Sequence, residues 1–320
     1  MTDIDVLCIG DLDVDMFVSV SEIPGFDQKV AGRNHGQKAG GMSANCAVAV
    51  SRLGLKSRLV AAVGSDPAGD VAIVSLTKDA VDLQYLARRH DEQTFMCLVL
   101  LSPAGEKSLI KLETPAYLPS VSDLVPDAFD GVRHLHVTFG SPELSLAALR
   151  MASERGLSTS LDLEPPDIVR NPHLLSAVLP LIDTLFLNKE AFEAARNVLG
   201  EPLTPLHLRG DAEVIVTLGA GGCQRFSGKH VVESPGFVVD PVDTTGAGDC
   251  FAGAYLVSRI SGMPIGDGLR FANAAAALST RSIGAQEGMP RRRQVEDFLA
   301  SRLSTGGRPD LLKTEGAVHV

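Results

Sequence analysis

A seven-residue stretch at positions 243–249 holds the residue types with the clearest chemistry in this chain. It reads Asp-Thr-Thr-Gly-Ala-Gly-Asp, and an apolar pattern with helical spacing follows at once. The small residues Gly246, Ala247 and Gly248 let their backbone amides approach a ligand closely. Because a helix is expected to begin there, unpaired N–H groups and the positive end of the helix dipole would attract an anion. The stretch therefore predicts a phosphate site, and Asp249 beside it is a candidate base for the proton of an attacking hydroxyl.

Simpler interpretations of this stretch stay open. Glycines before a helix often form only a tight connection, and an acid in a first helical turn often only balances the dipole. The stretch is not a Walker A loop, because no Gly-Lys-Ser/Thr follows, and it is not a dinucleotide fingerprint, because Gly-x-Gly-x-x-Gly is not completed. A ligand here would be bound with a different geometry from those two phosphate sites.

A second group of acids follows the first apolar run. Residues 4–10 have the composition of a buried strand, and Asp11, Asp13 and Asp15 come next, alternating with apolar residues. In an extended segment this spacing places the three carboxylates on one side of the chain.

Composition excludes several classes of function. The chain has 320 residues, 45% of them hydrophobic, and a formal charge of −10, so it can bury a large core but shows no electrostatic footprint for nucleic acid. No apolar run reaches the length of a membrane span, and the acidic start does not resemble a signal peptide. Five scattered cysteines without a Cys-x-x-Cys pair fit reduced core thiols, so we expect a cytoplasmic protein.

Strands and helices alternate along most of the sequence. This alternation predicts one α/β domain over 1–320, with a doubly wound, mostly parallel sheet flanked by helices. Ligands of such sheets bind at the carboxyl ends of the strands, where residues 11–15, Asp162 and 243–249 all fall. The expected strands cover 4–10, 59–63, 135–137, 158–163, 184–187 and 214–218, and the expected helices cover 43–53, 144–155, 190–199, 246–261, 269–280 and 294–303.

Two early strands and a hairpin do not fit this core. Residues 16–20 and 30–37 have strand patterns, and 95–112 has the pattern of a hairpin, each with apolar residues on one face. We expect a small inserted sheet, built from about 16–38 and 93–117, that closes over the substrate as a lid and excludes water. The polar tail at 304–320 is expected to be mobile.

Two motifs resemble the signatures of the ribokinase-like (PfkB) carbohydrate kinase family. Residues 40–54 begin Gly-Gly-Met-Ser-Ala-Asn and end Arg-Leu-Gly, and residues 243–254 read Asp-Thr-Thr-Gly-Ala-Gly-Asp-Cys-Phe-Ala-Gly-Ala. The motifs stand in the family's order, and the resemblance extends over about 5–303. It implies the ribokinase-like fold and a kinase that uses ATP and Mg²⁺.

The resemblance also implies roles on the acceptor side. Asp249 corresponds to the base that deprotonates the acceptor hydroxyl, and residues 246–248 correspond to the anion hole for the transferred phosphoryl group. Carboxylates and amides suit a polyhydroxylated substrate. The positions that resemble substrate-binding residues are Asp13, Asp15, Gly41 and Asn45.

On the nucleotide side, residues 217–222 end a strand and resemble the family's turn beside the phosphates and ribose. The matching positions are Thr217, Gly219 and Gly222, and an ordinary strand-to-strand turn is the alternative. Asn273 resembles the residue that borders the adenine pocket, with a surface helix position as its alternative.

The chain departs from the family pattern at three places. The Asn-x-x-Glu motif associated with magnesium would begin at Asn188, but residue 191 is Ala, and Glu190, one residue early, is left as the candidate for a water-mediated metal contact. Met42 stands where ribose-type kinases commonly have Lys. Gly288 stands where a monovalent-cation site often has Ser, so potassium activation is not predicted.

We therefore expect an ATP-dependent kinase acting on a hydroxyl of a small sugar or sugar derivative, with no nucleic-acid or membrane partner. The family resemblance adds a homodimer formed through the lid. A nucleoside kinase on the same fold is the alternative within the class, and the apolar Met42 leaves room for it. A non-catalytic sugar or nucleotide sensor is the alternative from another class. A Rossmann dehydrogenase is disfavoured because no dinucleotide fingerprint follows the first strand.

Overall fold

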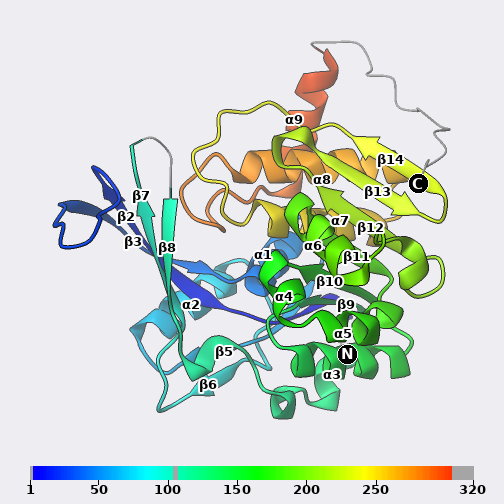
Figure 1. Ribbon diagram of the computed structural model, residues 1–320, viewed down its shortest axis with the longest axis horizontal. Coiled ribbons are helices and arrows are strands. Elements are labelled where there is room, and N and C mark those ends of the chain that lie inside the picture. Colours follow the sequence, from blue (N-terminus) through cyan, green and yellow to red (C-terminus); the bar gives the residue numbers. More distant parts are fainter. Residues whose placement is uncertain (1–2, 104–106, 305–320) are drawn as a thin grey trace.

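An eight-stranded sheet forms the centre of the computed structural model, which describes residues 3–103 and 107–304. Its strand order is β14-β13-β12-β11-β10-β9-β1-β4 (Figure 1). Neighbours from β12 to β4 are parallel, whereas β13 and β14 run antiparallel at one edge. The strands are β1 Ile4–Ile9, β4 Ser57–Val60, β9 Val132–Thr138, β10 Ser158–Leu163, β11 Thr184–Asn188, β12 Glu213–Thr217, β13 Cys223–Ser227 and β14 His230–Ser234.

Helices cover both faces of this sheet, because successive residues of its buried strands point to opposite sides. On β1, Val6 and Cys8 belong to one core cluster with α1, α2, α7, α8 and α9, whereas Leu7 and Ile9 belong to another with α3–α6. The predicted doubly wound architecture is thus confirmed. The helices are α1 Met42–Arg52, α2 Pro67–Lys78, α3 Pro142–Glu154, α4 Pro165–Arg170, α5 Pro172–Val178, α6 Lys189–Leu199, α7 Ala247–Ile260, α8 Ile265–Ser279 and α9 Arg292–Ser304.

A separate four-stranded sheet projects to the left of the main body in Figure 1. Its order is β3-β2-β7-β8, with β2 parallel to β7 and the outer pairs antiparallel. It is the small inserted sheet that the sequence predicted, and we call it the side sheet. Its strands are β2 Asp13–Val20, β3 Gly32–Gly40, β7 Met96–Leu101 and β8 Lys107–Leu112.

Two sequence expectations at the level of elements need comment. The single strand expected over 59–63 divides into β4 and β5, Ala62–Gly64, and β5 pairs with β6, Ala87–Arg89, in a sheet of its own. Of the tail expected at 304–320, residues 305–320 lie outside the described part of the chain. Among the helices of the described residues, none has the length and apolar character needed to cross a membrane.

Candidate active site

Helix α7 begins at the predicted phosphate site. Gly246, directly before the helix, has φ 75°, a left-handed conformation that favours glycine, and a Cβ there would lie 2.8 Å from the Cβ of Ala285. Within the described residues, the amides of Gly246 and Gly248 have no hydrogen-bond partner, whereas Ala247 N donates to Thr244 O at 3.3 Å. Two of the three predicted amides are therefore free to bind an anion at the positive end of the helix.

The carboxyl group of Asp249 is buried in the first turn of α7. Asn45 on α1 donates from Nδ2 to Asp249 Oδ2 at 2.8 Å. Burial raises the pKa of Asp249 to about 7; the Asn45 hydrogen bond opposes this shift, and the nearby charges of Asp11 and Glu164 add to it. A carboxyl group with a pKa near neutrality is suited to take a proton from a hydroxyl at physiological pH.

The alternating acids lie where β1 gives way to β2, and their tasks differ. Asp11 has a structural role, because its two carboxylate oxygens accept hydrogen bonds from the first two backbone amides of α1, each at 3.0 Å. Asp13 Oδ1 is buried without a hydrogen-bond partner among the described residues. Burial, followed by the charges of Asp15 and Asp11, raises the pKa of Asp13 well above its usual range, and burial raises that of Asp15 to about 6. An oxygen in this state is open to a donor from water or a ligand.

Gly41 allows α1 to start against these acids. Its φ is 96°, and a Cβ would lie 2.6 Å from the carbonyl oxygen of Asp11. One cavity of about 640 Å³ joins the groups described so far and continues toward the carboxyl ends of β11 and β12. Among the predicted site residues, its wall includes Asp13, Asp15, Gly41, Asn45, Asn188, Glu190, Thr217, Gly219, Gly246, Ala247, Gly248 and Asp249.

The sequence matches the model of the "pfkB family carbohydrate kinase" over residues 3–292. The chain belongs to the pfkB carbohydrate kinase family. The predicted class of enzyme, a carbohydrate kinase, is thereby confirmed. Among relatives, this pfkB kinase is 29% identical to the ribokinase of Bacillus subtilis over 306 residues, which cover 92% of this chain and 99% of the relative.

Solved structures give the same result for the fold. A structure from E. coli, assigned as ribokinase II and holding ATP and Mg²⁺, shares 26% identity with a TM-score of 0.78, and the match covers 93% of this chain and 99% of the other. A nucleoside kinase from Methanocaldococcus jannaschii, 22% identical, has a TM-score of 0.80 over 93% of this chain and 98% of its own. At that level of identity the second match shows only that this pfkB kinase shares its fold.

The predicted nucleotide turn joins β12 to the antiparallel β13, so it is a strand-to-strand turn as well as part of the cavity wall. Thr217 and Gly219 line the cavity, but Gly222 does not. Gly222 has φ 96°, and a Cβ there would lie 2.1 Å from Ser234 O. Gly222 thus lets the turn pack against the end of β14, and its role in binding the cofactor stays a prediction.

Asn273 on α8 takes part in packing. It is buried and does not line the cavity. Its Nδ2 donates to Ser234 Oγ and Ser234 O, both at 3.0 Å, and lies 3.3 Å from Pro235 O. The side chain is therefore occupied in holding the chain beyond β14, because buried backbone carbonyls need donors. The surface alternative is therefore wrong, and the predicted contact with the cofactor stays a prediction.

The altered magnesium motif forms the junction of β11 and α6. Asn188 caps the helix, accepting Ala191 N on Oδ1 at 2.7 Å. Ala191 is fully buried, so an acid at this position would point into the core and not toward the cavity. Glu190 is exposed in the first turn of α6 and lines the cavity, which is where a metal contact would need it.

Sequence reasoning missed three residues of the site. Phe95 and Tyr117 line the cavity and pack together with ring centroids 4.4 Å apart. Gln286 is bonded to Asn45 behind the cavity wall. No local pattern marks these residues, because each comes to the site from a connecting segment and only tertiary packing places it.

Proposed function

We propose that this pfkB kinase transfers the γ-phosphoryl group of ATP to a hydroxyl of a small, unphosphorylated sugar or sugar derivative. One observation carries the proposal: a single cavity contains the buried carboxyl of Asp249, the free amides of Gly246 and Gly248, and the unpartnered oxygen of Asp13. These are a base, an anion hole and an acceptor for a substrate donor.

The transfer assigns each group one task. The acceptor oxygen forms a bond to the γ-phosphorus as the bond from that phosphorus to the β–γ bridging oxygen breaks. Asp249 takes the proton of the acceptor hydroxyl, and the amides of residues 246–248 stabilise the charge on the phosphoryl oxygens. ADP leaves with the bonding electron pair, and Asp249 then releases its proton to solvent.

The opposite end of the cavity fits ATP and Mg²⁺. Thr217 and Gly219 line it, and they are proposed to contact the nucleotide. Magnesium is usually held by one or two carboxylates together with substrate phosphates and water, so a dedicated cage is not required. Glu190, close to Asn188, would hold the ion through water. When bound, Mg²⁺ supplies neutralising charge to the phosphates.

The acceptor end is rich in acids, which bears on the substrate class. Asp162 and Glu164 line it together with Asp13 and Asp15, and burial raises the pKa of all four carboxyl groups. Lys111 is the cation on this part of the wall. Acceptors in such excess favour a ligand with many hydroxyl donors and disfavour one that brings a second phosphate.

A nucleoside is the second candidate because the Phe95–Tyr117 pair gives the cavity an aromatic surface on which a base could stack. A panel of free sugars, amino sugars, nucleosides and sugar phosphates, followed by ADP release, tests the proposal. We expect a free sugar or sugar derivative to give the highest kcat/KM. A preference for nucleosides would establish the second candidate, and a preference for sugar phosphates would contradict both.

The pH dependence of turnover follows from the base. Asp249 acts when ionised, and its pKa is raised to about 7, so kcat should be low in acid and rise to a plateau above neutrality. Two pH units below the midpoint, about 1% of a carboxyl group is ionised. We therefore expect kcat at pH 5 to be roughly 1% of the plateau value, measured at saturating substrates with folding checked by circular dichroism. A flat profile from pH 5 to 9 would contradict the assignment.

The side sheet is proposed to act as the lid. Lys107 on β8 donates to Thr245 Oγ1 at 3.0 Å, and Lys38 on β3 lies 3.2 Å from Glu287. The side sheet thus contacts the segment directly before Gly246 and also the loop after α8 that carries Glu287. Because alternate residues of β8 face opposite ways, Leu109 and Lys111 line the cavity while residues 108, 110 and 112 point away from it.

The same strand supports a homodimer. β8 is an edge strand, and Ile110 and Leu112 are 48% and 50% exposed on the face that points away from the cavity. Such an edge invites pairing with a second copy. We expect light scattering to give twice the chain mass of 33.7 kDa and Ile110→Lys to shift it toward one chain. A monomeric wild type would reject this part of the proposal.

The state of the cysteine side chains supports a location in a reducing compartment. Each of the five cysteines is free and buried, as expected for a protein that stays in the cytoplasm.

A further inference from the structure

Four polar side chains from four separate segments form a hydrogen-bonded row that ends on Asp249. Ser75 on α2 donates to Gln286 Oε1 at 3.1 Å, Gln286 Nε2 donates to Asn45 Oδ1 at 3.1 Å, and Asn45 Nδ2 donates to Asp249 Oδ2 at 2.8 Å. Every bond in the row points the same way, toward the carboxylate. Gln286 and Asn45 are 2% and 3% exposed, so water cannot readily replace a missing partner.

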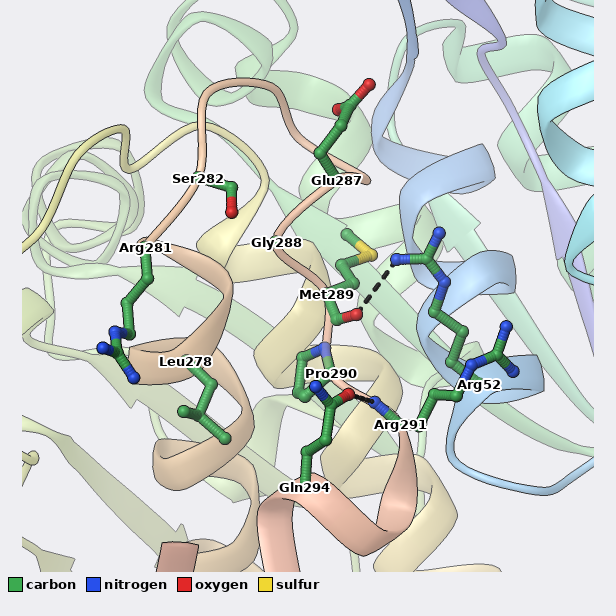
Figure 2. A pocket seen from close by; sticks show the side chains of 10 residues that line it. All are labelled: Arg52, Leu278, Arg281, Ser282, Glu287, Gly288, Met289, Pro290, Arg291 and Gln294. Atoms are coloured by element: carbon green, nitrogen blue, oxygen red, sulfur yellow. Dashed lines mark hydrogen bonds between the residues drawn. The ribbon is translucent and has the colours of Figure 1, made fainter.

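The loop that carries Gln286 is fixed from behind by Arg52 on α1. Arg52 Nη1 donates to the carbonyl oxygens of Gln286 and Met289, the latter at 3.0 Å, and the contact with Met289 is drawn in Figure 2. The remaining nitrogens of Arg52 donate to both carboxylate oxygens of Asp79, at 2.8 and 2.7 Å. The backbone of Gln286 is therefore held in place independently of its side chain.

We propose that Gln286 is a positioning residue, which fixes the Asn45 amide with its NH₂ group toward Asp249 and so favours the ionised form of the base. This inference rests on the proposed function of Asp249. A protonated Asp249 could donate to Asn45 only if the Asn45 amide turned its oxygen toward it. That turn would bring the Asn45 NH₂ group against the Gln286 NH₂ group, so both amides and the Ser75 hydroxyl must reverse together.

The acidic groups around Asp249 disfavour its ionised form, so the orientation of the Asn45 amide matters for the base. Four acids disfavour a further negative charge on Asp249: Asp11 in the segment between β1 and β2, Asp13 on β2, Asp162 on β10 and Glu164 directly after β10. Lys111 on β8 lies farther into the acceptor end, where it acts on Asp13 and Glu164. Among the described residues, the Asn45 amide is the hydrogen-bond donor to the Asp249 carboxylate, and this bond opposes the effect of burial on the pKa of the base.

The test is the pH profile of kcat for Gln286→Met, a substitution of similar length that removes both bonds of the side chain. We expect the midpoint to rise by about one pH unit, which lowers kcat at pH 7 about five-fold, while the plateau at high pH stays close to that of wild type. KM for ATP should change less than two-fold. Gln294→Met is the matched control, because Gln294 is exposed on α9 in the pocket of Figure 2 and accepts only Arg291 N.

An unchanged midpoint in Gln286→Met, or an equal loss of kcat at every pH, would overturn the proposal. Should that variant fail to fold, Ser75→Ala carries the test, since it frees Gln286 to turn. An upward shift of the midpoint then supports the proposal, and an unshifted midpoint overturns it. Failure of the proposed function itself is distinguishable, because it would appear as retained turnover in Asp249→Asn.

Discussion

Replacing Asp249 with Asn is expected to lower kcat by about 10²- to 10⁴-fold, the usual cost of removing an oriented general base. The shape of the site should survive, since Asn can present its oxygen to the Asn45 amide in place of the carboxylate. Affinity for ATP should therefore stay within a few-fold of wild type. Turnover by ADP release and nucleotide binding by calorimetry measure the two effects separately.

Asp267→Asn is the matched control for this experiment. Asp267 is an acid in the first turn of α8, the helix after α7, and it does not line the cavity. Loss of a dipole partner costs about 0.3–1 kcal/mol of stability, with no effect on turnover. If both variants behaved alike, Asp249 would be only a dipole partner and the base would lie elsewhere.

Gly246→Ala is expected to lower kcat by about 10²- to 10³-fold, as the loss of one donor does in other anion holes. Two effects combine in this variant. Alanine is strained at φ 75°, and its Cβ would lie 2.8 Å from Ala285 Cβ and 3.0 Å from Ala285 Cα. The amide at the start of α7 must therefore move. Single-turnover rates at saturating ATP separate this loss from weaker binding.

The control here is Gly266→Ala in the first turn of α8, where an added Cβ meets no atom within 4 Å. It should keep full activity and a similar melting temperature. If Gly246→Ala also retained at least half of the wild-type kcat, residues 246–248 would not form the anion hole.

The sequence predicted the elements whose pattern is local. The apolar runs of β1, β9, β10, β11 and β12 are buried on both sides, so their composition alone marks them as strands of a parallel sheet. β13 and β14 were missed because both strands, β14 at the edge of the sheet and β13 next to it, mix polar and apolar residues. The break between β4 and β5 was missed for another reason: every residue from Ser57 to Gly64 is buried, and nothing in the composition marks where the chain changes sheets.

The residues of the candidate site also differ in whether a local sequence pattern marks them. Asp249 and its glycines form one short motif, so their proximity was fixed by chain connectivity before any folding was considered. Gly222 and Asn273 were predicted from resemblance of position alone, and the structure shows that each takes part in the packing around β14. Gln286 lies 241 positions from Asn45, and a contact at that separation is decided by how α1 and the loop after α8 meet.

The buried position of Asp13 Oδ1 on the cavity wall bears on how the site could select its substrate. A buried oxygen without a donor costs about 1–3 kcal/mol, and the raised pKa values of Asp13 and Asp15 mean that a proton shared between the two acids competes with a ligand for this oxygen. We expect a sugar that places a hydroxyl donor against this oxygen to bind more tightly than an analogue that lacks the corresponding hydroxyl. Discrimination among substrates would then depend on the acids at the acceptor end of the cavity as well as on the phosphate site.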